Sequence, residues 1–114
     1  MPEITIQEVQ DFLLKNKFHL KPNQREVSFP VIKRIHTRLQ KGKIFSPIKV
    51  SDDKIIDGHH RFICLSILGI NVEEVAGGNN LSVKNNFQWT EVRVVSDDYD
   101  SEEEIQYYFQ KYDL

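Results

Sequence analysis

The chain of 114 residues has a single cysteine and no long apolar run. Both features limit the classes of protein to which it can belong. Its single cysteine, Cys64, excludes an internal disulfide and fits a reducing cytoplasm. No apolar run reaches the ~20 residues of a membrane helix. The first ten residues carry acids and lack a basic n-region, unlike a signal peptide. With 39% hydrophobic and 28% charged residues, we expect one folded cytoplasmic domain over residues 1–114, with no membrane partner.

The charges are unevenly distributed, although the net charge is only −2. Residues 15–43 contain nine Lys or Arg and one acid, whereas residues 62–114 contain three bases and ten acids. Arg34, Arg38 and Lys41 are expected on one face of a helix. This asymmetry has two interpretations: a side that faces phosphate groups, or a solvated helix face plus an acidic surface segment.

Capping and apolar spacing predict four helices. Thr5 and Glu8 form a capping box ahead of apolar residues at helical spacing. A second helix is expected from Ser28 or Phe29 to Lys41, closed by Gly42. The other two, each marked by a cap signal, are expected at residues 60–68, before a C-cap glycine, and 101–112. The first of these should be buried on most sides, and the second should bury Ile105, Tyr108 and either Phe109 or Tyr112.

Short apolar runs predict four strands between these helices. They lie in residues 46–50, 54–57, 70–75 and 89–95, and the stretch 76–87 reads as a long polar loop. A turn at residues 51–53 should join the first two. The predicted fold class is therefore α/β (α+β), with a small mixed β-sheet flanked by helices.

The stretch "DGHHR", residues 57–61, joins an expected strand to an expected helix. Gly58 permits a sharp turn, and the first amides of a helix attract anions. Arg61, His59 and His60 add donors for phosphate oxygens. Asp57 would then bind a metal, accept a proton or anchor Arg61. The alternative is that Asp57 caps the helix and pairs with Arg61 while both histidines lie at the surface.

Four stretches of this chain resemble the ParB/sulfiredoxin-like superfamily. They are "LKPNQRE", "GKIFSPIKV", "IIDGHHRF" and "LGINVEEV", and they span roughly residues 20–75. The resemblance implies a ParB/sulfiredoxin-like single domain. It also implies a phosphate-binding loop at Gly58, His60 and Arg61 that holds ATP or CTP.

The branches of this superfamily differ around the motif. Sulfiredoxins have a reactive cysteine where this chain has His59, and Cys64 lies inside an apolar helix where thiols are usually inert. ParB proteins continue into a helix-turn-helix domain, for which this chain has no counterpart. The loop is most similar to that of the free serine kinases, in which the aspartate matching Asp57 is a catalytic candidate.

The same resemblance points to a second loop. Free serine kinases have a glutamate where this chain has Gln24, and a glutamine cannot accept a proton from a hydroxyl. Glu26, two residues later, is the remaining catalytic candidate. Gln24 and Arg25 are then candidates for substrate binding.

Three functions follow, in order of preference. The first is nucleotide or phosphate binding through residues 57–61. The second is ATP-dependent phosphoryl transfer to a small hydroxyl substrate, with Mg²⁺ bound by Asp57. The third is a nucleic-acid-binding module or nuclease, indicated by the basic stretch 15–43. Oligomeric state is not predicted.

Overall fold

A computed structural model describes residues 3–77 and 87–112. Its elements in chain order are α1 (Ile6–Lys15), β1 (Glu26–Ser28), α2 (Phe29–Gln40), β2 (Ile48–Ser51), β3 (Lys54–Asp57), α3 (His59–Leu68), β4 (Glu74–Ala76), the 3₁₀ turn η2 (Trp89–Glu91), β5 (Arg93–Val95) and α4 (Glu102–Tyr112). The predicted α+β class with a small mixed sheet and flanking helices is confirmed.

The strands form two small sheets. One has the order β3-β2-β4, in which β2 is antiparallel to β3 and parallel to β4. The other is the parallel pair β1-β5, with Val27 opposite Val94. Asp52 and Asp53 close the β2–β3 hairpin with positive φ angles of 50° and 61°, as tight hairpin turns require. The turn predicted at residues 51–53 is confirmed.

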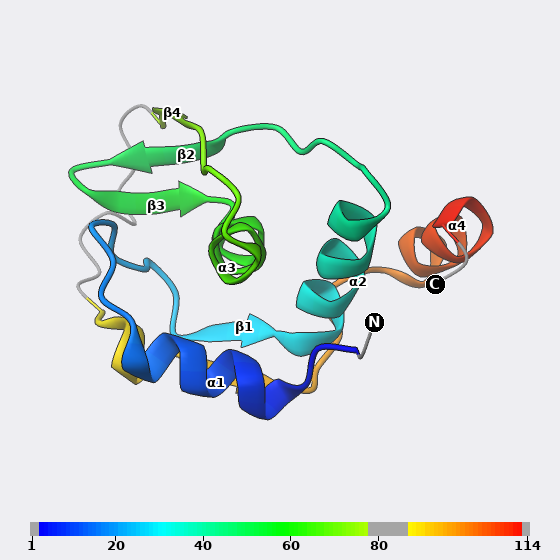
Figure 1. Ribbon diagram of the computed structural model, residues 1–114, viewed down its shortest axis with the longest axis horizontal. Helices are drawn as coiled ribbons and strands as arrows, with labels where there is room; N and C mark the ends of the chain where they lie inside the picture. The colour runs from blue at the N-terminus through cyan, green and yellow to red at the C-terminus, as the bar shows by residue number, and fades with distance from the viewer. Residues whose placement is uncertain (1–2, 78–86, 113–114) are drawn as a thin grey trace.

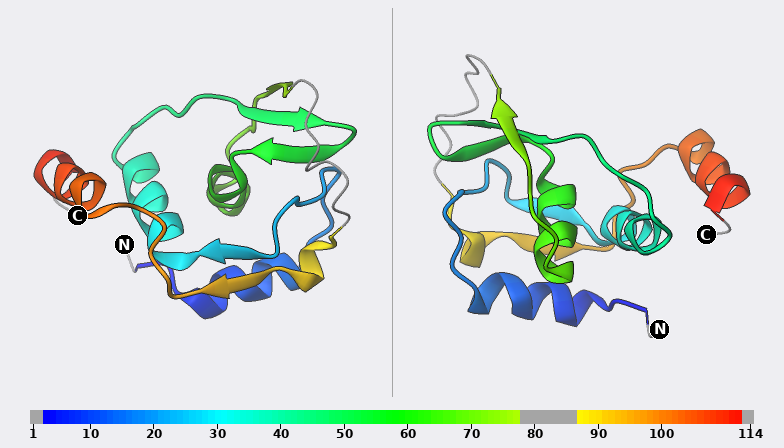
Figure 2. Two further views of the ribbon diagram at one scale, coloured as in Figure 1. Left: turned by 180° about the vertical axis from the view of Figure 1, so that it is seen from behind. Right: turned by 45° about the horizontal axis from the view of Figure 1, so that its top comes forward.

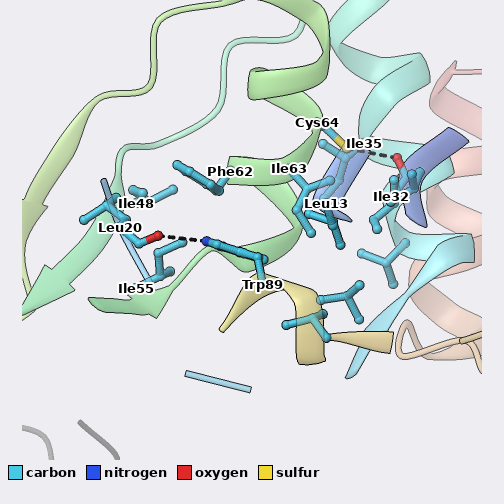
Figure 3. Packing of buried hydrophobic residues seen from close by; sticks show 14 of the residues in the cluster. Leu13, Leu20, Ile32, Ile35, Ile48, Ile55, Phe62, Ile63, Cys64 and Trp89 are labelled. Atoms are coloured by element: carbon cyan, nitrogen blue, oxygen red, sulfur yellow. Dashed lines mark hydrogen bonds between the residues drawn. The ribbon is translucent and has the colours of Figure 1, made fainter. Parts of the chain in front are cut away.

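Helix α3 lies at the centre of the molecule. Figure 1 shows it between the β2-β3 hairpin above and the layer of β1 and α1 below, with α2 beside it. The side chains that fill this space include Phe62, Trp89 and Ile63 (Figure 3). The Trp89 indole N–H donates to the carbonyl of Leu20 (2.8 Å), so the one polar atom of this ring is satisfied inside the core.

The predicted helix ends agree closely with the structure. The Thr5–Glu8 capping box is present, and Ser28 caps α2 by accepting from the amide of Val31. Gly69 ends α3 in the left-handed conformation that glycine favours. Helix α3 begins at His59, one residue earlier than expected. Burial is also less complete than expected, because the last four residues of α3, Leu65 to Leu68, are only half-buried.

Three expectations about elements are wrong. Strand β1 was not among the four expected strands, because its three residues are too few to show an alternating pattern. Residues 89–91, expected in a strand, form η2, where Gln88 and Glu91 make a capping box. Helix α4 buries none of its residues, and Phe109 is 55% exposed, because α4 does not reach the core. Most of the loop predicted at 76–87 lies outside the described residues.

Within the described parts of the chain, none of the helices has the length and apolar content needed to cross a membrane.

Candidate functional site

The turn between β3 and α3, residues 57–61, is called the phosphate turn below. Gly58 adopts φ 104° and ψ 28°, a conformation that side chains disfavour. A Cβ at this position would come within 2.7 Å of both an Arg61 guanidinium nitrogen and the Ile48 side chain. Gly58 is therefore favoured by the backbone angle and by the close approach of the fully buried Ile48 side chain.

The N-terminus of α3 has no side-chain cap. Its first backbone hydrogen bond runs from the amide of Phe62 to the carbonyl of Gly58 (2.8 Å). The preceding amides of the first turn have no acceptor within the helix and carry partial positive charge. Such an end is suited to an anion.

Arg61 folds back over this turn. Its side chain is 22% exposed, and its Nη2 lies 3.4 Å from a carboxylate oxygen of Asp57, at the outer limit of a hydrogen bond. The Arg61 Nε is buried and has no hydrogen-bond partner among the described residues. A buried guanidinium N–H without an acceptor is costly, so an incoming oxygen ligand near this atom would be favourable.

The two histidines of the phosphate turn face inward, not toward solvent. His59 is 4% exposed, and its Nε2 accepts the backbone N–H of Asn23 (2.8 Å). His60 Nε2 accepts the backbone N–H of Ser28 (2.9 Å). A backbone N–H can only donate, so both Nε2 atoms are unprotonated and each neutral ring carries its proton on Nδ1.

Burial lowers the pKa of His59 and of His60 to about 4 in each case. The neighbouring His60 lowers the pKa of His59 further, and Asp57 acts in the opposite direction. Both rings are therefore neutral near pH 7. Arg61 and the helix amides, and not imidazolium charge, supply the positive potential of the phosphate turn.

The histidines fasten the segment of residues 23–28, called the anchored loop below. Their bonds hold its two ends, Asn23 and Ser28, against the first turn of α3. Ser28 also connects the anchored loop to the C-terminal part of the chain, because its hydroxyl donates to the carbonyl of Asp97 (2.7 Å). Sequence reasoning placed Ser28 at the start of the second helix but missed this role, which depends on contacts with residues far along the chain.

The predicted residues Gln24, Arg25 and Glu26 lie in the middle of the anchored loop. They line an open cavity of about 780 Å³ together with Glu91, Arg93 and Tyr99. Glu26 pairs with Arg93 at 2.5 Å, and the Gln24 amide donates to the carbonyl of Glu26 (2.7 Å). This cavity contains charges of both signs.

The cavity adjoins the phosphate turn through ring contacts. The ring of His60 packs edge-on against that of Tyr99, with centroids 5.8 Å apart, and Tyr99 lines the cavity. The structure thus brings together the two groups of candidate residues, 24–26 and 57–61, by means of His60. Arg93 and Tyr99 were missed because they lie more than 60 residues away from the anchored loop in sequence.

Two other expectations concern Cys64 and metal binding. Cys64 is fully buried, its thiol donates to the carbonyl of Ile32 (3.2 Å, Figure 3), and burial raises its pKa to about 12. The predicted burial of this thiol is confirmed. Residues 3–77 and 87–112 contain no cluster of three His, Cys, Asp or Glu side chains that could hold a metal ion. Asp57 alone, 64% exposed, could add one ligand to a Mg²⁺ that phosphates and water also bind.

No protein-family model, curated protein or solved structure matches this chain. The class that the geometry defines is a small α+β fold with an uncapped helix N-terminus beside a half-buried arginine. The resemblance to the ParB/sulfiredoxin-like superfamily stays a prediction.

Proposed function

We propose that this protein binds a nucleotide, ATP or CTP, by its phosphates at the phosphate turn. The amides at the start of α3 and the guanidinium of Arg61 would hold the phosphate oxygens. The anchored loop would form the neighbouring wall, with the cavity at Gln24–Glu26 beside it. The observation that carries this proposal is the buried, unpartnered Nε of Arg61 at an uncapped helix N-terminus.

The electrostatics of the turn support a charged ligand rather than a neutral one. Arg61 is a permanent cation, and its only ion pair among the described residues is the long contact with Asp57. A phosphate would offer it a bidentate partner. The neutral histidines keep the anchored loop in place without competing for the anion, since each uses its Nε2 as an acceptor.

Mg²⁺ fits this site in a limited way. Nucleotide-bound Mg²⁺ usually keeps several waters and takes one or two protein carboxylates. Asp57 is an exposed carboxylate next to Arg61 and can supply one. When bound, the ion would offset phosphate charge.

Thermal unfolding with ATP, CTP, GTP and ADP, each with and without Mg²⁺, tests the proposal. A ligand at a hundred times its Kd adds roughly 2.7 kcal/mol to the free energy of unfolding. We expect a clear rise in Tm for at least one nucleotide. The absence of any rise for all four would contradict nucleotide binding.

Two variants locate the site. Arg61→Ala should abolish the nucleotide-dependent rise in Tm, and Arg61→Lys, which keeps the charge but not the fork of donors, should reduce it. Lys33→Ala is the control, because it also removes one positive charge but from an exposed pair with Glu3. Equal binding by the parent and Arg61→Ala would place the ligand elsewhere.

A further inference from the structure

The C-terminal residues 97–112, called the strap below, lie along the outside of α2. Figures 1 and 2 show α4 apart from the rest of the molecule, next to α2. The strap begins with six acids within eight residues, Asp97 to Glu104. Helix α2 carries the basic row Arg34, Arg38 and Lys41, which recurs at helical spacing.

Two arginines of this row hold the strap. Arg34 pairs with Asp98, and with Asp100 at 2.9 Å, and its side chain is only 17% exposed. Arg38 is 7% exposed, and its guanidinium lies 3.9 Å from the ring centre of Tyr108 and 5.1 Å from that of Phe45. The strap therefore removes two permanent cations from solvent.

The strap itself contributes little to the core. No residue of α4 is buried, and the side chains of Tyr107 and Phe109 are more than half exposed. Each of these ion pairs and ring–cation contacts is weak compared with the burial of core side chains. Helix α4 and the carboxylates of Asp98 and Asp100 can thus leave α2 without disturbing the hydrophobic core, while Asp97 and Tyr99 stay bonded to Ser28.

We propose that the strap masks a face of α2 that binds the phosphate backbone of nucleic acid. The carboxylates of the strap occupy the positions that phosphate oxygens of a polyanion would take. Removing the strap would uncover Arg34 and Arg38 beside Lys41. A nucleic acid suits this row better than an acidic peptide, because arginine binds phosphate bidentately and stacks on bases as it does on Tyr108.

A pair of charge-matched double variants tests the masking. Both double variants change the net charge from −2 to 0. Asp98→Asn/Asp100→Asn removes the partners of Arg34, whereas Glu102→Gln/Glu103→Gln leaves them in place. Glu102 and Glu103 line a shallow surface of α4 that includes no residue of α2. The readout is fluorescence anisotropy with a labelled single-stranded 20-mer DNA over a range of salt concentrations.

We expect the Asp98→Asn/Asp100→Asn variant to bind the DNA at least tenfold more tightly than the parent, with a steeper salt dependence. The Glu102→Gln/Glu103→Gln variant should change affinity less than threefold. Adding Arg34→Gln to the first variant should reverse its gain. Tyr108→Ala, which detaches α4 from Arg38, should raise the affinity independently, and it decides the matter if the double variant does not fold.

Several results would overturn the proposal. Equal gains for the two double variants would show an effect of net charge alone. No gain for either Asp98→Asn/Asp100→Asn or Tyr108→Ala would show that α2 has no such face. Tighter binding of a poly-glutamate peptide without tighter binding of DNA would assign the face to acidic proteins.

Discussion

The phosphate turn and the strap both tie together segments that lie far apart in sequence, but they do so in opposite ways. At the phosphate turn, two neutral, largely buried rings accept backbone amides of the anchored loop. At the strap, the partly exposed carboxylates of Asp98 and Asp100 and the ring of Tyr108 meet arginines of α2. Buried neutral hydrogen bonds depend on protonation and little on salt, whereas ion pairs near the surface depend on salt.

The difference indicates which of the two regions opens at a lower cost in free energy. Breaking a histidine bond leaves a buried amide without an acceptor, a cost of about 1–3 kcal/mol. Releasing the strap exposes groups that water solvates well. We therefore expect the anchored loop, with Asp97 and Tyr99 bonded to its Ser28, to open only with global unfolding. The Asp98 side chain and residues 100–112 of the strap should open on their own.

Lowering the pH should have the largest effect, and it should act on the anchored loop. An unfolded histidine has a pKa near 6.5, and His59 and His60 have values lowered to about 4 in the fold. Between these pH values the unfolded chain binds more protons, so stability is fully present above pH 6.5 and is lost as the pH falls toward 4. The loss should be about 3 kcal/mol per histidine, measured by urea unfolding at pH 7, 6, 5 and 4.5.

The control is the double variant His59→Gln/His60→Gln. Glutamine can accept the two amides but does not titrate, so this variant should keep only the part of the pH dependence that carboxylates cause. Parallel curves for parent and variant would show that the two histidines do not titrate with these pKa values.

Gly58→Ala should cost about 3 kcal/mol, from the disfavoured backbone angle together with the crowding against Ile48 and Arg61. Gly42→Ala is the matched control, because Gly42 also has a positive φ, 93°, but a Cβ there meets nothing within 4 Å. Its cost should be about 1–2 kcal/mol. Denaturant unfolding at pH 7 measures both costs, and equal costs would mean that the crowding against Ile48 and Arg61 adds nothing.

Raising NaCl from 0.05 to 0.5 M should weaken the attachment of the strap by about 1 kcal/mol. Amide hydrogen exchange in α4 should become severalfold faster, while exchange in α3 stays the same. The Asp98→Asn/Asp100→Asn variant should exchange fast at both salt concentrations. If amide exchange in α4 of the parent protein did not depend on salt, the strap would not be held by screened ion pairs.

Asp57→Asn should have the smallest effect on stability, within about 0.5 kcal/mol. The Asp57 side chain is 64% exposed, and its contact with Arg61 is long, at 3.4 Å. We expect its affinity for ATP, measured by calorimetry, to rise severalfold, because a negative charge beside the phosphates is removed. A fall in affinity would mean that Asp57 anchors Arg61. ATP turnover by the parent that Asp57→Asn loses would identify an enzyme.

Local signals in the sequence determined the helix starts, the β2–β3 hairpin and the turn at Gly58, because caps, positive-φ turns and apolar spacing act over a few residues. The same local signals identified residues 57–61 as candidates for phosphate binding. The orientations of the His59 and His60 rings could not be predicted from the sequence, since they depend on where the anchored loop lies.

Only the tertiary structure decided which residues the basic and the acidic parts of the chain contact. The basic residues of α2 were expected to face phosphate or solvent, yet the acidic strap covers Arg34 and Arg38. The same packing left α4 outside the core despite its apolar spacing, because the other elements already enclose the buried cluster. Attraction between distant charges depends on their separation in space, and sequence distance does not specify that separation.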